Sequence, residues 1–126
     1  MLRFSRSLRM GGLGLVAGAA LIAAALPATA GAQSTGGPTV NIIEPDASNV
    51  LSWGFDNTDL VVPAGTVVTW MNTGNNQHTV TADDSTLDSG LIDPGNTFSF
   101  EFDTPGQIFT YHCTPHPWMK ATIEVQ

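Results

Sequence analysis

Residues 97–102 read Thr97-Phe98-Ser99-Phe100-Glu101-Phe102, and polar and aromatic side chains alternate through this stretch without a break. Alternation with a period of two indicates a β-strand with one buried face and one exposed face. No stretch after Leu26 shows a helical periodicity of useful length, so strands of this kind set the class of the fold. The sequence therefore predicts an all-β protein.

Other segments have the same character, and turn-forming residues separate them. Pro94-Gly95-Asn96 and Thr104-Pro105-Gly106-Gln107 punctuate the second half of the chain as turns. Seven or eight short strands at this spacing predict a Greek-key antiparallel β-sandwich, with Trp53, Trp70 and Tyr111 in its core. Besides 97–102, the predicted strands are residues 40–44, 60–62, 66–71, 77–81, 108–113 and 121–125, with 50–53 as a candidate eighth.

The first 32 residues have the pattern of a secretory signal peptide. Three arginines open the chain, residues 11–26 are almost entirely apolar, and small residues follow Pro27. This pattern predicts an exported protein, periplasmic or otherwise extracytoplasmic, with cleavage after Ala30 or Ala32. Retention as an N-terminal membrane anchor is the alternative, because the apolar run approaches the shortest length that spans a bilayer.

After the signal peptide we expect a flexible lead-in over residues 33–38 and one domain over residues 39–126, without membrane insertion. All eleven Asp and Glu residues lie at or after Glu44, and Lys120 is the only Lys or Arg beyond residue 32, so this part carries ten net negative charges with His neutral. Binding to nucleic acid or anionic lipid requires a cationic surface, and this charge argues against both. We expect a soluble, acidic monomer.

One short segment near the C-terminus concentrates chemically distinctive side chains. It holds the only cysteine of the chain, two of its three histidines and a methionine: Tyr111-His112-Cys113-Thr114-Pro115-His116-Pro117-Trp118-Met119. A lone cysteine in an exported chain cannot form an intramolecular disulfide. One thiolate, two imidazoles and one thioether are the ligands of a blue-copper electron-transfer site. We therefore predict one copper ion bound by His78, Cys113, His116 and Met119, with the methionine as the weak axial ligand.

The spacing C-x2-H-x2-M places three of these donors on one loop between the last two strands. Pro115 and Pro117 stiffen that loop because each fixes its own φ angle. His112 neighbours Cys113, and strand alternation directs neighbouring side chains to opposite faces. We therefore expect His112 to be a solvated strand residue and not a ligand.

With these residues in view, the sequence resembles the cupredoxins, in particular the amicyanin/plastocyanin-like blue copper proteins. The loop 113–119, in which an aromatic residue precedes the methionine, is its most specific part, and residues 68–72 with 78–80 resemble the family's first-histidine region. The resemblance covers residues 60–126. It implies an eight-stranded Greek-key sandwich and one-electron transfer in an extracytoplasmic space.

The chain departs from the family pattern at two positions. Thr79 stands where many relatives have an Asn that braces the loops near the thiolate, so the surroundings of the copper and its potential are expected to differ. Ala121 follows Lys120 where relatives often have Gly, and this small change is expected to be tolerated. Neither departure alters the predicted ligands.

Three other functional classes compete with the electron carrier. A copper-binding or trafficking protein shares the ligands and is the principal alternative. A multicopper enzyme needs further histidines, and the chain has none left; four ligands also leave no open position for a substrate. Structural zinc seldom uses methionine. We therefore predict a non-enzymatic carrier that meets redox protein partners transiently near His116 and Trp118, as relatives do; local packing of Trp118 is the alternative role for that side chain.

Overall fold

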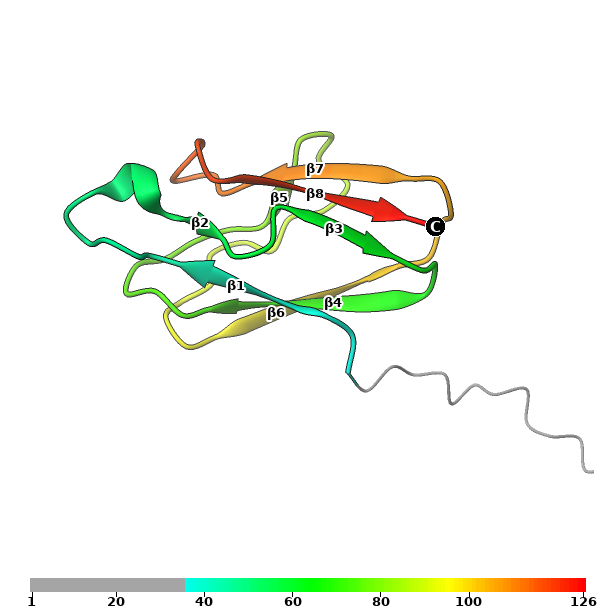
Figure 1. The fold of residues 1–126 in the computed structure, drawn as a ribbon, viewed down its shortest axis with the longest axis horizontal. Coiled ribbons are helices and arrows are strands. Elements are labelled where there is room, and N and C mark those ends of the chain that lie inside the picture. Colours follow the sequence, from blue (N-terminus) through cyan, green and yellow to red (C-terminus); the bar gives the residue numbers. More distant parts are fainter. Residues whose placement is uncertain (1–35) are drawn as a thin grey trace, which may run out of the picture. The chain divides into compact units, whose positions relative to one another are not determined.

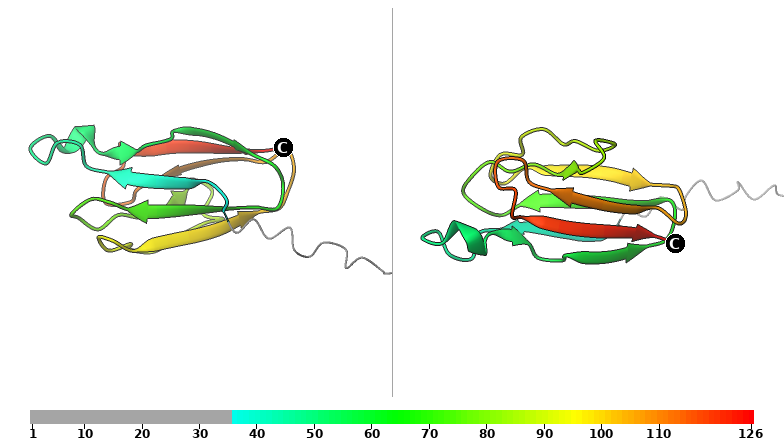
Figure 2. Two further views of the ribbon diagram at one scale, coloured as in Figure 1. Left: turned by 60° about the horizontal axis from the view of Figure 1, so that its bottom comes forward. Right: turned by 90° about the horizontal axis from the view of Figure 1, so that it is seen from above.

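The computed structural model describes residues 36–126, so the predicted signal peptide and the start of the lead-in lie outside the described residues. Eight strands form two four-stranded sheets that stack as a sandwich (Figures 1 and 2), in the orders β2-β1-β4-β6 and β3-β8-β7-β5. This all-β sandwich confirms the predicted class. The strands are β1 (Thr39–Ile43), β2 (Gly54–Phe55), β3 (Asp59–Val62), β4 (Thr66–Asn72), β5 (Thr81–Ala82), β6 (Thr97–Phe102), β7 (Ile108–His112) and β8 (Lys120–Val125).

The predicted sandwich forms, but its sheets are not entirely antiparallel, because each contains one parallel pair. In the first sheet β1 runs parallel to β4, with Val40 opposite Trp70. In the second, β3 runs parallel to β8, with Leu60 opposite Ile123. Parallel neighbours require a crossover connection, and here the chain passes through β2 and β3 between β1 and β4. Both sheets are therefore mixed.

Side-chain alternation in the predicted strands is largely confirmed. On β8 the three predicted inward residues, Ala121, Ile123 and Val125, are 6%, 0% and 1% exposed. On β6, Phe102 is buried, whereas Phe98 and Phe100 are only half-buried. The Phe102 ring lies against the rings of Trp70, Phe100 and Phe109.

The predicted strand at residues 77–81 forms only in part. β5 begins at Thr81, and His78 makes an isolated antiparallel bridge to Ile92. Between them, side chains take the backbone donors that a sheet would use: the Val80 amide donates to the hydroxyl of Ser89 at 2.8 Å. Local bonds to side chains thus replace the sheet ladder in front of β5.

The candidate strand at residues 50–53 is wrong as well. Val50–Ser52 form a short 3-10 helix, η1, in which the Ser52 amide donates to the Asn49 carbonyl at 2.9 Å. The Ser52 hydroxyl donates to the same carbonyl at 2.7 Å. The strand that follows, β2, comprises Gly54 and Phe55 only. An apolar run of this length does not by itself distinguish a strand from a helical turn.

The core lies between the sheets and contains the residues predicted for it. Trp70 and Trp53 are 0% and 8% exposed, and Tyr111 is 1% exposed. The indole N–H of Trp70 on one sheet donates to the hydroxyl of Tyr111 on the other at 3.2 Å. This bond satisfies both buried polar groups, which apolar surroundings would otherwise penalise by about 1–3 kcal/mol each. Within residues 36–126, no helix has the length and apolar character needed to cross a membrane.

Three loops meet at one end of the sandwich, opposite the C-terminus (Figure 1). They are residues 44–53 between β1 and β2, residues 73–80 between β4 and β5, and residues 113–119 between β7 and β8. The predicted ligand residues all belong to the second and third of these loops. The fold thus collects at one end residues that the chain separates widely.

Candidate metal centre

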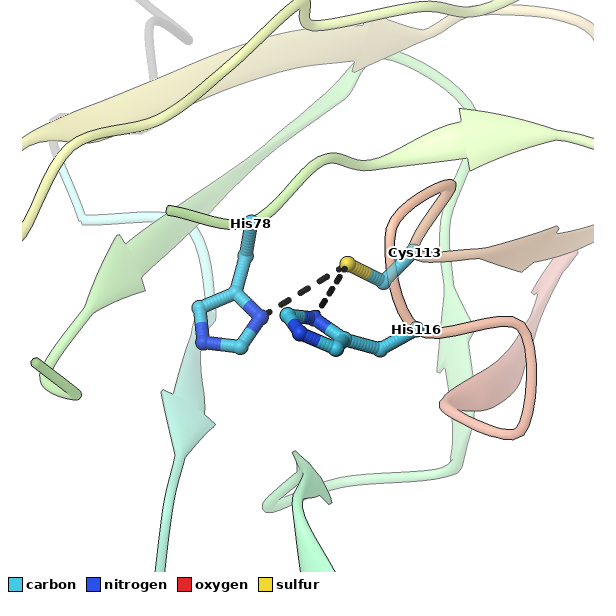
Figure 3. A group of neighbouring side chains, drawn as sticks. All are labelled: His78, Cys113 and His116. Atoms are coloured by element: carbon cyan, nitrogen blue, oxygen red, sulfur yellow. Dashed lines mark hydrogen bonds between the residues drawn. The ribbon is translucent and has the colours of Figure 1, made fainter. Parts of the chain in front are cut away.

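Three of the four predicted ligand residues bring their donor atoms together. One donor atom from each of His78, Cys113 and His116 lies within 4.8 Å of the others. The Cys113 sulfur is 3.6 Å from Nδ1 of His78 and 3.5 Å from Nδ1 of His116 (Figure 3). In Figure 3 the two imidazoles approach the sulfur from different loops, and each turns its Nδ1 toward it.

The loop that carries Cys113, His116 and Met119 is closed by its own backbone. The Cys113 amide donates to the Met119 carbonyl at 3.1 Å, and the His116 amide donates to the Cys113 carbonyl at 3.1 Å. The Met119 amide donates to the His116 carbonyl at 2.9 Å. The Met119 side chain is 1% exposed. These bonds, together with two prolines that fix φ, hold the predicted donors of the loop in one arrangement.

His78 is fixed from a different part of the chain. Its amide donates to the Ile92 carbonyl at 3.2 Å, and the Ile92 amide donates back to the His78 carbonyl at 2.7 Å. The residue is 0% exposed. Nε2, the nitrogen that points away from Cys113, lies 2.8 Å from a carboxylate oxygen of Glu44. A buried imidazole with both nitrogens engaged has little freedom to rotate.

Two residues that shape this region were not among the predicted site residues. Asn72 is 0% exposed, and its side-chain amide donates to the carbonyls of Asn76 and Ile92 at 2.7 and 2.8 Å. Its carbonyl oxygen accepts from the Gly74 amide at 2.9 Å. Glu44, which directly follows β1, is the second of these residues. Their roles depend on contacts between loops, and sequence spacing does not report such contacts.

Aromatic rings surround the histidine pair. The ring of Trp53 meets that of His116 edge-on, with centroids 5.1 Å apart, and that of His78 at 6.0 Å. The Trp118 ring lies 5.3 Å from that of His116, and its indole N–H donates to the Val50 carbonyl at 2.9 Å. Trp118 nevertheless remains 39% exposed. The side chain is therefore packed locally and also accessible to solvent.

The electrostatics of the site favour neutral imidazole and an uncharged thiol before metal enters. Burial raises the pKa of the Cys113 thiol above its ordinary value, although hydrogen bonds from Thr79 and His116 oppose the shift. Burial lowers the pKa of His116, and the neighbouring His78 adds to this effect while Glu44 opposes it. A metal therefore meets a histidine lone pair that is free at neutral pH, and it displaces the thiol proton on binding.

His112 lies outside the cluster, as expected. It belongs to β7 opposite Thr81 of β5, and its Nδ1 lies 2.6 Å from a carboxylate oxygen of Asp83. This hydrogen bond lowers the pKa of Asp83, with burial opposing and Lys120 contributing a smaller lowering. Asp83, Asp84, Asp88 and Asp93 are all exposed, so they contribute polar loop surface.

The donor distances fit a single metal ion. Metal bonds to histidine nitrogen and cysteine sulfur measure about 2.0–2.3 Å, so neighbouring donors in one coordination shell lie about 3.5–3.8 Å apart. The observed separations of 3.6 and 3.5 Å from sulfur to nitrogen agree with this range. The mixture of soft sulfur and imidazole nitrogen suits copper in both of its common oxidation states.

Two known copper-family proteins are similar to this chain in sequence. The plastocyanin of Scenedesmus fuscus is 34% identical over 85 residues, which are 57% of this chain and 86% of that protein. The amicyanin-alpha of Methylorubrum extorquens is 31% identical over 77 residues, which are 57% of this chain and 64% of that protein.

Solved structures of related proteins have a similar fold. A variant of amicyanin in the Cu(I) state superposes with a TM-score of 0.61 at 25% identity, over 72% of this chain and 83% of that one. A purple cupredoxin from Nitrosopumilus maritimus shares the fold, with a TM-score of 0.63 at 23% identity over 71% of this chain and 99% of that one. The family of copper-binding proteins described as plastocyanin/azurin matches residues 46–126. Sequence, fold and the cluster of donors agree, and the chain belongs to the plastocyanin/azurin family of copper-binding proteins.

Proposed function

We propose that this protein is a one-electron carrier with a single type 1 copper ion, held by His78, Cys113 and His116, with Met119 as the weak axial ligand. The observation that carries the proposal is the convergence of one thiol and two imidazoles within 4.8 Å on a β-sandwich. Copper supplies the electron chemistry by alternating between Cu(I) and Cu(II). The residues supply a thiolate and a thioether that favour Cu(I), and imidazoles that Cu(II) also accepts.

The protein's own contribution is rigidity and the exclusion of water. His78 and Cys113 are both 0% exposed, and backbone hydrogen bonds fix the loops on which they lie. A carrier exchanges electrons quickly when its ligands move little between the two oxidation states. Four protein donors leave no open coordination position for a substrate, which supports a carrier over an enzyme. Copper trafficking, the principal alternative, requires donors that exchange the metal readily, and the deep burial of Cys113 argues against it.

We also propose where the carrier works and how far its domain extends. Residues 1–32 have the pattern of a secretory signal, and residues 33–38 form a lead-in to a copper domain at residues 39–126. The mature protein would act outside the cytoplasm. A lone, buried cysteine suits that setting because copper ligation protects the thiol from oxidation.

Partners would dock transiently around the exposed edge of His116. Val50, Leu51 and Trp118 are 42%, 71% and 39% exposed, and Trp118 links to Val50 by its indole hydrogen bond. A small apolar surface of this kind suits a weak contact with a redox protein that must release quickly. We therefore expect the electron to leave through the His116 imidazole.

Optical and EPR spectra of the copper-loaded protein test the proposed centre. We expect an intense thiolate-to-copper band in the visible range and a narrow copper hyperfine splitting, both absent in Cys113→Ser. Spectroelectrochemistry should show full, repeated reduction and reoxidation of the band. A blue protein that cannot be reoxidised, or that passes its copper rapidly to a chelator, would instead support trafficking.

The electron self-exchange rate tests the docking surface without knowledge of the partner. Two copies of a carrier exchange electrons through the same edge, and NMR line broadening in mixtures of the Cu(I) and Cu(II) forms gives the rate. Leu51→Asp should slow the exchange, because it places a charge next to Val50 in the exposed apolar surface that includes Trp118. Ile108→Asp is the matched control, since Ile108 is 66% exposed at the opposite end of β7. High salt limits repulsion between the two acidic copies. Equal rates in both variants would reject this surface.

A further inference from the structure

Glu44 makes a contact with His78 that the sequence pattern did not predict. Its Oε1 lies 2.8 Å from Nε2 of His78, across 34 residues of sequence. Both side chains are sealed from solvent, at 2% exposed for Glu44 and 0% for His78. The imidazole therefore lies between two groups: the Glu44 carboxylate at Nε2 and the Cys113 sulfur, 3.6 Å from Nδ1.

The carboxylate is ionised and held in place by the loop after β4. The amides of Asn75 and Asn76 donate to its two oxygens at 3.0 and 2.9 Å, and the Asn76 side chain donates at 3.0 Å. These three N–H donors, with the imidazole of His78, face both carboxylate oxygens, and donors of this kind favour the ionised form of a carboxylate. An ionised carboxylate only accepts hydrogen bonds, so Nε2 of His78 carries the proton and Nδ1 presents its lone pair.

The loop leaves room for this carboxylate at Gly74. A Cβ built on Gly74 would overlap the carboxylate and the methylene next to it. Gly54, by contrast, has open space where its Cβ would lie. Glu44 can therefore occupy this position only because residue 74 has no side chain.

The negative charge of Glu44 is not neutralised by a cationic side chain. Its donors are neutral amides and the imidazole of His78, and Lys120, the only Lys or Arg in the described part of the chain, interacts with Asp83. A backbone carbonyl in this place would orient the ring equally well but would carry no full charge. One imidazole separates the Glu44 charge from the metal position.

We propose that Glu44 is the positioning residue of His78, which fixes the imidazole with Nδ1 toward copper, and that its charge lowers the reduction potential of the site. The inference rests on the proposed copper centre and deepens it. Partners of this kind, which hold the far nitrogen of a ligand histidine, typically contribute about 10–100-fold to metal affinity. A nearby negative charge stabilises Cu(II) more than Cu(I), because the ion of higher charge gains more from it.

The first test compares the reduction potentials of Glu44→Gln and Glu124→Gln in the copper-loaded protein. Both substitutions remove one negative charge, but Glu124 is exposed near the end of β8, away from the site. We expect Glu44→Gln to raise the reduction potential clearly and to weaken copper binding about 10–100-fold, whereas Glu124→Gln has little effect at moderate salt. Equal potentials and affinities in the two variants would overturn the proposal, even for a protein that is blue and redox-active.

A second pair of variants keeps the charge and moves only the carboxylate. Gly74→Ala should displace Glu44 from Nε2, while Gly54→Ala adds the same methyl group in open space. In the metal-free protein, NMR should detect a slowly exchanging Nε2–H proton of His78 in the wild type and in Gly54→Ala, and its loss in Gly74→Ala. A persistent signal in Gly74→Ala, or its absence in the wild type, would contradict the proposal. Because this signal requires no copper, it separates a failure of the Glu44 role from a failure of the copper function.

Discussion

The backbone amide of Thr79 donates a hydrogen bond to the sulfur of Cys113 at 3.3 Å, which ties the two halves of the site together. The Thr79 hydroxyl accepts a second bond, from the Thr114 amide, at 2.8 Å. Many relatives have an Asn at this position, and the sequence left open how a threonine would replace it. The hydroxyl braces the same pair of loops, so the substitution preserves the connection beside the thiolate.

Removal of this hydroxyl should loosen the site. Thr79→Val keeps the shape and the backbone bond to sulfur but leaves the Thr114 amide without its partner. We expect a loss of about 1–3 kcal/mol in the free energy of unfolding, the usual cost of an unsatisfied polar group in a partly buried place. Chemical denaturation of the metal-free protein measures it. Thr79→Ser is the control and should lose less, because its hydroxyl remains; equal losses in both variants would mean that the methyl group, not the brace, matters.

A single substitution should distinguish the role of Met119 as the axial copper ligand from its role in packing. Met119→Leu conserves volume, so the fold should lose less than about 1.5 kcal/mol even though the side chain is 1% exposed. The reduction potential should rise, because loss of the weak axial donor leaves three ligands in a more hydrophobic site, and that arrangement suits Cu(I) better than Cu(II). Voltammetry together with denaturation provides both values. A stable variant with an unchanged potential and spectrum would show that Met119 packs beside copper without binding it.

Local features of this chain could be predicted from its sequence, whereas contacts between distant segments could not. Cys113, His116 and Met119 lie on one short loop, so their spacing alone suggested their joint chemistry. The alternation in β6 indicated which face is buried, but alternation is silent about which strand lies beside it. The parallel pairing of β1 with β4 therefore went unforeseen.

The same reason explains why Glu44 was missed. Its carboxylate reaches His78 only because β1 ends beside the loop after β4, and neither residue carries a local signal of the other. The wrong strand at residues 50–53 has a different cause. Its apolar residues fit a strand pattern, but hydrogen bonds to the Asn49 carbonyl close a 3-10 turn, and Trp53 then packs on the histidine rings.

Stability should fall in alkali through Tyr111. Burial raises its pKa to about 12 from 10.0, a hydrogen bond from Trp70 opposes the shift, and Asp56 adds to it. Between these values the unfolded chain releases the phenol proton while the folded protein keeps it, so the unfolded state binds fewer protons. The Tyr111 contribution is therefore complete below pH 10 and is lost as pH rises toward 12, by about 3 kcal/mol at most.

Tyr111 is the only tyrosine, so the absorbance of tyrosinate reports this one group. We expect its titration near pH 12 in the folded, metal-free protein, together with a decline in unfolding free energy that begins near pH 10. In Tyr111→Phe the part of the decline due to this group should disappear, although the baseline stability falls because the Trp70 N–H loses its acceptor. A normal phenol titration in the folded protein would contradict the prediction.

Substitution of the two histidines of the C-terminal segment should have different effects on the copper site. His112 lies on β7, bonded to an exposed Asp83, whereas His116 lies beside the Cys113 sulfur. His112→Ala should leave the copper spectrum and potential almost unchanged and reduce stability by no more than about 1 kcal/mol, as expected for a partly exposed pair. His116→Ala should lose the type 1 spectrum, because one of three strong donors is gone. Added imidazole should restore colour to His116→Ala alone, since only that variant opens a coordination position. Loss of the blue band in His112→Ala would place this histidine in the copper site and require a different set of ligands.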